Sequence, residues 1–179
     1  MRQVYLDHQS ATPLLPEAFD AMRPYFTEYF GNASSLHQHG LRVRDALKTA
    51  RQQHAALVHA ESEEEIFFTS DGTESANLAI KGVAEMYAEK GNHIITTSIE
   101  HKAVLDTCHY LETKGFEVTY LPVDQYGRVS AEDVRKAITP KTILVSIMMA
   151  NNEIGSINPV AEIGAVCKAA GVLFHTDAV

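Results

Sequence analysis

Residues 142–179, TILVSIMMANNEIGSINPVAEIGAVCKAAGVLFHTDAV, contain one complete strand–helix–strand unit. Thr142–Met148 is an apolar run typical of a strand that is buried on both faces, Pro159–Ala170 is predicted to be a helix, and Val172–His175 is a second short strand. Two strands that are joined through a helix pair in parallel, with a right-handed crossover. This stretch therefore predicts an α/β fold with a mostly parallel sheet covered by helices.

The same alternation continues upstream, so that residues 61–179 are predicted to form one α/β domain with five strands. The further strands are predicted at Ile66–Thr69, Ile94–Thr97 and Val118–Leu121, and the further helices at Thr73–Tyr87, Lys102–Thr113 and Ser130–Ile138. Ser130 is a typical N-cap residue, with Asp133 three positions later.

Residues 1–60 are predicted to form a helical segment that precedes this domain. Pro16 suits a helix start and Gly31 a helix stop, which places a first helix at Glu17–Phe30. Pro24 is expected to kink or interrupt that helix. A second helix with a loose apolar face is predicted at Leu41–His59.

The composition is that of a globular protein, with 179 residues, 45% hydrophobic residues and a formal net charge of −8. The acidic balance argues against nucleic acid or an anionic membrane as a partner, since both require basic patches. No signal core or membrane-length apolar run is visible, so we expect a cytoplasmic protein. Cys108 and Cys167 form no CxxC pair and are expected to be buried small residues rather than disulfide or zinc ligands.

Polar clusters follow four of the five predicted strands. In parallel α/β sheets ligands bind beyond the carboxyl ends of the strands, so these clusters are expected to share one sheet edge. They are Ser70–Ser75, Ser98–His101, Ala150–Glu153 and Thr176–Val179, whereas Pro122–Asp124 reads as an ordinary turn.

Each cluster also has a purely structural interpretation. The glycine-containing loop before Thr73 can hold a phosphate at a helix start, but Asp71 and Glu74 have the spacing of a capping box. His101 can simply cap a helix, and a carboxylate such as Asp177 can do the same at a strand end. His37 and His39 lack matching partners, so no metal site is predicted. No GxGxxG or GxxxxGK[ST] motif supports a dinucleotide or nucleotide site.

Six motifs in order make the chain resemble the cysteine desulfurases, which are class V aminotransferase-like, fold-type I enzymes that use pyridoxal phosphate (PLP). The motifs are YLD (Tyr5–Asp7) with ATP (Ala11–Pro13), FGN (Phe30–Asn32) with SS (Ser34–Ser35), FTSDGTES (Phe68–Ser75), EHKAV (Glu100–Val104), ANNEIG (Ala150–Gly155) and FHTDAV (Phe174–Val179). The resemblance covers essentially the whole chain and corresponds to the N-terminal half of such an enzyme, with an incomplete PLP-binding domain.

The resemblance implies a role for five residues at the predicted sheet edge. Gly72 and Thr73 would hold the PLP phosphate through a backbone N–H and a hydroxyl. His101 would stack on the pyridine ring and assist proton transfer. Asn152 would donate a hydrogen bond to the ring hydroxyl oxygen, and Asp177 would pair with the ring nitrogen.

Other implications of the resemblance concern the rest of the chain. Asn32 is expected to lie near the substrate carboxylate. The family commonly has proline where this chain has Ala33. The cofactor-binding lysine and the persulfide-carrying cysteine of the family come later than Val179. By the same comparison Ile66–Thr69 would lack its sheet neighbour and Glu17–Phe30 would be exposed, so we expect the chain not to act alone as a stable enzyme.

The function implied is the PLP-dependent removal of sulfur from L-cysteine, giving L-alanine and an enzyme persulfide that supplies iron–sulfur clusters. The parent protein is expected to be a homodimer, to contain a C-terminal half in cis or in trans, and to meet a sulfur-acceptor or scaffold protein. Alternatives are a selenocysteine lyase or another class V enzyme, and a non-catalytic paralogue that binds a partner.

Overall fold

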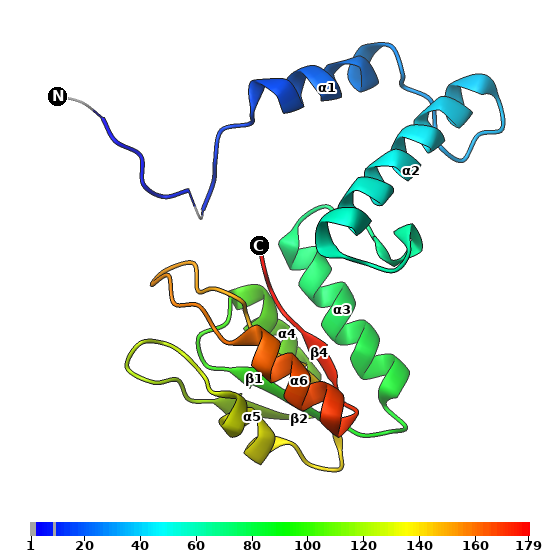
Figure 1. Cartoon of the computed structure of the whole chain (residues 1–179). Helices are drawn as coiled ribbons and strands as arrows, with labels where there is room; N and C mark the ends of the chain where they lie inside the picture. Colours follow the sequence, from blue (N-terminus) through cyan, green and yellow to red (C-terminus); the bar gives the residue numbers. More distant parts are fainter. Residues whose placement is uncertain (1–2, 9) are drawn as a thin grey trace. The chain divides into compact units, whose positions relative to one another are not determined.

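The computed structural model describes residues 3–8 and 10–179 and divides into two compact units (Figure 1). One unit extends to Phe68, and the other comprises Thr69–Val179. Each unit has its own secondary structure, and the candidate residues that follow the strands all belong to the second unit.

The second unit is built on a four-stranded sheet in which all neighbouring strands are parallel. The strands are β1 (His93–Thr97), β2 (Glu117–Leu121), β3 (Thr142–Ser146) and β4 (Leu173–His175), and their order in the sheet is β2-β1-β3-β4. This confirms the predicted α/β fold, because parallel neighbouring strands need crossover connections and helices usually supply them.

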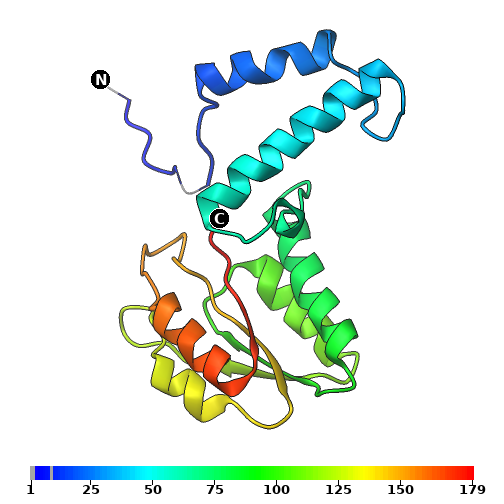
Figure 2. The same cartoon turned by 45° about the vertical axis from the view of Figure 1, so that its right-hand side comes forward.

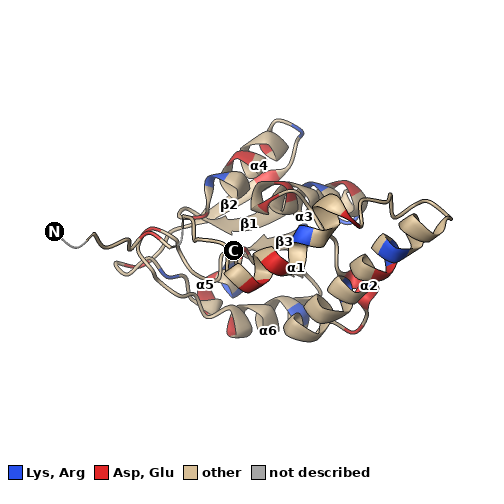
Figure 3. Ribbon diagram, turned by 90° about the horizontal axis from the view of Figure 1, so that it is seen from above, with Lys and Arg blue, Asp and Glu red and all other residues tan. Residues whose placement is uncertain are grey.

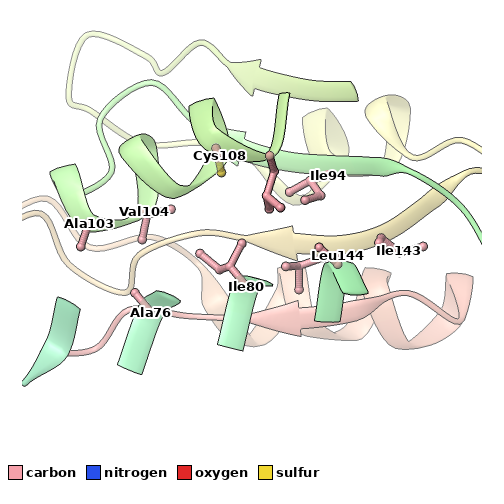
Figure 4. Packing of buried hydrophobic residues seen from close by; sticks show 10 residues of the cluster. Ala76, Ile80, Ile94, Ala103, Val104, Cys108, Ile143 and Leu144 are labelled. Atoms are coloured by element: carbon pink, nitrogen blue, oxygen red, sulfur yellow. The ribbon is translucent and has the colours of Figure 1, made fainter. Parts of the chain in front are cut away.

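Helices cover both faces of this sheet, as Figures 1 and 2 show. They are α3 (Gly72–Tyr87), α4 (Lys102–Glu112), α5 (Ala131–Ala137) and α6 (Val160–Ala170). Consecutive strand residues point to opposite faces, so Ile94 and Leu144 pack with α3 and α4, while Ile95 and Val145 pack with α5 and α6. Cys108 lies in the first cluster (Figure 4) and Cys167 in the second, which confirms that both cysteines are buried.

Charged residues lie mainly on the helices and loops (Figure 3), and the sequences of β1, β3 and β4 contain none. Strands with no charged side chain suit a sheet that is covered on both faces. None of the described helices combines the length and the apolar character that crossing a membrane requires.

The first unit contains two helices, α1 (Pro16–Thr27) and α2 (Gln38–Val58), and one 3-10 turn, η1 (Glu63–Glu65). Pro24 was predicted to kink or interrupt this helix, and the interruption does not occur, because α1 continues through Pro24. Pro24 has no N–H to donate to the preceding turn, and α1 ends within one turn of it. No residue of α1 is buried, as predicted for this segment, and Phe26 is 72% exposed.

The segment Ile66–Thr69 is not a strand as predicted, but the predicted lack of a sheet neighbour for it is confirmed. The chain there is extended after η1 but pairs with no strand of the described sheet. Phe67 is 75% exposed, and the Ile66 carbonyl accepts a hydrogen bond from Arg51 Nε at 3.2 Å. An apolar run becomes a strand only where another strand satisfies its backbone groups, and this run has no such neighbour.

Candidate functional site

The start of α3 combines a capped first turn with two free backbone amides. The Asp71 carboxylate accepts a hydrogen bond from the Glu74 N–H at 2.7 Å, so Asp71 is the N-cap, as predicted. The Glu74 carboxylate accepts from the Ser70 N–H at 2.6 Å, and hydrogen bonding from the side chain and the backbone of Ser70 lowers the Glu74 pKa. Among the described residues no acceptor contacts the Gly72 or Thr73 N–H, which leaves both amides at the positive end of the helix dipole.

His101 is the N-cap of α4, at the end of the loop that follows β1. Its Nδ1 accepts a hydrogen bond from the Ala103 N–H at 3.1 Å. An accepting Nδ1 carries no proton, so the neutral ring has its proton on Nε2. The predicted capping role is therefore confirmed. The imidazole is nevertheless an exposed side chain whose orientation is set by the cap.

The loop after β3 has one structural asparagine and one exposed asparagine. Asn151 is buried, its Nδ2 donates to the Ile99 carbonyl at 2.9 Å, and its Oδ1 accepts from the Glu153 and Ile154 amides. Asn152 is exposed and has no hydrogen bond to a described residue through its side chain. The Asn151–Asn152 pair is thus a turn in which only the second side chain is available to a ligand.

Asp177 lies two residues beyond β4, where the chain continues alongside the end of β3. Its carbonyl accepts from the Met149 N–H at 2.8 Å, and its Oδ1 accepts from the Val179 N–H at 3.1 Å. Asp177 is half-buried. Below it His175 Nδ1 lies 2.8 Å from Ser146 Oγ, and burial lowers the His175 pKa while the Asp177 charge opposes this change.

These strand-end loops meet at one edge of the sheet, as the sequence predicts. A side chain placed at Gly72 would bring its Cβ within 3.0 Å of Val179 Cγ2, so the start of α3 lies against the segment that follows Asp177. The contact between Ile99 and Asn151 joins the His101 loop to the loop of Asn152. The sheet edge therefore collects all five residues that were predicted to bind the cofactor.

Two other predicted features have local structural roles. Pro122–Asp124 is the expected turn, because Asp124 Oδ1 accepts from the Tyr126 and Arg128 amides and Gly127 has a positive φ of 74°. Asn32 belongs to the first unit, where its Oδ1 accepts from the Ser34 N–H at 2.8 Å and closes a local turn. Its predicted contact with a substrate carboxylate remains a prediction.

Glu100 is a site residue that sequence reasoning missed. It is 5% exposed, its carboxylate accepts hydrogen bonds from Thr97 and Met148, and burial raises its pKa to about 7. The available signal was its place in the EHKAV motif, directly before His101. A glutamate next to a helix start is usually a solvated residue, so its burial was not expected.

The family model of class V aminotransferases, "Aminotransferase class-V", matches residues 4–179. The chain belongs to the class V aminotransferase family. Members of this family, including cysteine desulfurases, depend in general on PLP.

Similar proteins agree with this assignment. "Cysteine desulfurase IscS" of Dictyoglomus turgidum is 53% identical over 178 residues, which is 99% of this chain and 45% of that protein. The protein of the same description from Methanosarcina thermophila is 55% identical over 178 residues, 99% of this chain and 44% of that protein. The chain thus spans about half the length of these class V relatives.

Solved structures support the fold of the class V chain over its whole length. A "NIFS-like protein" superposes with a TM-score of 0.95 and 42% identity over 99% of this chain and 49% of that one. A structure described as "SspA in complex with cysteine" gives a TM-score of 0.93 and 42% identity over 97% of this chain and 50% of that one. The sequence-based resemblance to cysteine desulfurases is therefore confirmed.

Proposed function

We propose that the protein is a PLP-dependent cysteine desulfurase and that this chain supplies the cofactor-binding residues. The observation that carries the proposal is the convergence of three groups at one sheet edge of a class V chain. These groups are the free amides of Gly72 and Thr73, the oriented ring of His101 and the carboxylate of Asp177. We assign them, in order, to the phosphate, the ring face and the ring nitrogen of PLP.

The residues at this edge fit the cofactor chemically. Two unpaired N–H groups at a helix N-terminus are suited to a phosphate. Gly72 adds no side chain between these amides and the segment that follows Asp177, where a Cβ would lie only 3.0 Å from Val179 Cγ2. A fixed carboxylate such as Asp177 favours the protonated form of a neighbouring ring nitrogen. The Asp71 carboxylate is engaged in capping its own helix through the Glu74 N–H.

PLP, when bound, withdraws electrons from an attached amino acid and so weakens its Cα–H and Cβ–S bonds. The chain's own residues would prepare this chemistry. Asp177 would hold a proton on the ring nitrogen. His101 would cover one ring face and, with Nε2 protonated, could transfer that proton, while Asn152 would orient the ring through its amide.

The overall reaction that we propose moves one sulfur atom. L-Cysteine would lose sulfur from Cβ to a cysteine thiol of the enzyme, which would give L-alanine and an enzyme persulfide. From the same resemblance we propose that the protein is a cytoplasmic homodimer. It would pass the persulfide sulfur to an acceptor or scaffold protein for iron–sulfur clusters. The relatives named cysteine desulfurase and the structure of SspA in complex with cysteine support L-cysteine as the substrate.

The test is product analysis with the full-length protein, PLP, L-cysteine and a thiol reductant. We expect alanine and sulfide in equal amounts, because each persulfide releases one sulfide on reduction. Selenocysteine in place of cysteine separates the desulfurase from a selenocysteine lyase, which would form alanine only from the selenium compound. A protein that binds PLP but forms no alanine from either substrate would contradict both activities and favour the non-catalytic paralogue.

A further inference from the structure

Glu100 is a buried carboxylate between two loops that carry proposed cofactor residues. Its Oε1 accepts from the Thr97 hydroxyl at 2.7 Å, and the Met148 N–H lies 3.0 Å from both of its oxygens. A carboxylate that is only 5% exposed is costly to bury unless such donors satisfy it. Glu100 therefore occupies a buried position where an apolar side chain would cost less free energy of desolvation.

The two ends of this contact lead directly to His101 and Asp177. His101 follows Glu100 in the sequence and caps α4. Met149 follows Met148, and its N–H donates to the Asp177 carbonyl at 2.8 Å. Glu100 thus directly precedes His101, and its carboxylate binds Met148, whose neighbour Met149 binds the backbone of Asp177.

We propose that Glu100 is a positioning residue that holds His101 and Asp177 at a constant separation. This role rests on the proposed function, in which His101 is assigned to the ring face of PLP and Asp177 to the ring nitrogen. Glu100 itself touches neither cofactor nor substrate in this assignment. It acts through the loop after β1 and the end of β3.

The charges around Glu100 make this contact sensitive to pH. Burial raises the Glu100 pKa to about 7, the Asp177 charge adds to this rise, and the hydrogen bonds from Met148 and Thr97 oppose it. Glu100 also interacts with Cys108 on α4, and burial raises the pKa of that thiol to about 12, so the thiol stays neutral. A protonated carboxyl accepts the Met148 N–H less strongly, so the link is expected to loosen as the pH falls through about 7.

The first test follows NMR signals of the cofactor-free, full-length protein as the pH is changed. The signals are the backbone amides of Met148, Asp177 and His101. We expect all three to report one midpoint near 7 in the wild type, and we expect that midpoint to vanish in Glu100→Gln. A response confined to Met148, with His101 and Asp177 unchanged in Glu100→Gln, would overturn the proposal.

His93→Phe is the matched control for this test. His93 is also 5% exposed and lies on β1, but at the opposite end of the strand from Glu100. Its ring nitrogens lie 2.7 Å from Thr142 Oγ1 and 2.9 Å from Thr119 Oγ1, so its replacement removes two hydrogen bonds of a buried side chain. We expect His93→Phe to lower the stability and to keep the shared midpoint, and loss of this midpoint in the control would also count against the proposal.

The second test measures PLP affinity by titration of the same variants. Glu100→Gln is expected to weaken binding about tenfold at neutral pH, which is the effect of losing one hydrogen bond to a charged group, while His93→Phe stays near the wild type. Equal affinity in Glu100→Gln and the wild type would overturn the positioning role and leave the proposed function intact. A wild type that binds no PLP would overturn the proposed function, and the cofactor-free NMR comparison would still decide the role of Glu100.

Discussion

At the scale of the residue, the candidate site depends on side chains that local hydrogen bonds have already oriented. Asp177 is held by its carbonyl and by Oδ1, and His101 by the contact of Nδ1 with the Ala103 N–H. A group that is fixed before the ligand arrives loses little conformational freedom on binding. The same bonds also decide which atoms remain available, namely Nε2 of His101 and Oδ2 of Asp177.

Replacement of Asp177 by Asn should weaken PLP binding while the fold is kept. Asn can still accept from the Val179 N–H but carries no charge to hold a proton on the ring nitrogen. Loss of a hydrogen bond between charged groups corresponds to about 10- to 100-fold in affinity. The measurement is a PLP titration, with Asp124→Asn as a control that removes the same charge from the turn after β2. Similar affinities for the two variants would argue against the assigned role of Asp177.

Two replacements of His101 distinguish its role as a helix cap from the role of its aromatic ring. Asn is a good N-cap residue, so His101→Asn should keep the start of α4 while it removes the aromatic ring. His101→Ala should lose both and be less stable than His101→Asn by about 1 kcal/mol. We expect both variants to lose cofactor-dependent alanine formation, with only His101→Ala losing stability in urea unfolding. Wild-type activity in His101→Asn would show that residue 101 is needed only as a helix cap and that its aromatic ring has no role in the reaction.

At the scale of the element, a buried histidine joins three strands of the sheet. His93 of β1 contacts Thr119 of β2 and Thr142 of β3 through its two ring nitrogens. Burial lowers the His93 pKa, Lys141 also lowers it, and Glu117 opposes this change. The folded protein therefore disfavours the charged ring at the amino end of the sheet.

This burial predicts a dependence of stability on pH with a defined sign. In the unfolded chain His93 takes up its proton near its ordinary pKa of about 6.5, whereas the folded chain binds it only at lower pH. The stabilising contribution is therefore complete above that value and is lost as the pH falls below it. Urea unfolding of the wild type and of His93→Gln at about pH 7.5 and about pH 5.5 checks this, because only the wild type carries this contribution. The contribution of Glu100 has the opposite sign over part of this range, and the comparison of the two proteins cancels it. An equal loss of stability in both proteins would contradict the prediction.

At the scale of the whole molecule, most of the packing of the second unit lies in two clusters, one on each face of the sheet. Ile80 of α3 is fully buried in the first cluster, whereas Leu78, two residues earlier on the same helix, is 57% exposed. The helix thus offers a direct comparison between a core position and a surface position for side chains of the same size.

Truncation of these two side chains should have very different effects on stability. Ile80→Ala should lower the free energy of unfolding by about 2–5 kcal/mol, because the cavity cannot close completely. Leu78→Ala should change it by no more than about 0.5 kcal/mol. Chemical unfolding monitored by circular dichroism measures both. Comparable losses would mean that another surface covers Leu78 in solution.

The amino-acid sequence by itself determined the order and type of most elements and the group of loops that carries the site. Apolar runs, Pro16, and the caps Asp71 and Ser130 act within a few residues of themselves, so their effects can be predicted locally. The tertiary structure decided the rest. Ile66–Thr69 resembles β3 in composition, but only β3 has neighbours that satisfy its backbone, and Glu100 became a buried link because distant Met148 lies above it. Pairing and burial depend on what the remote parts of the chain bring into contact, and no local pattern contains that information.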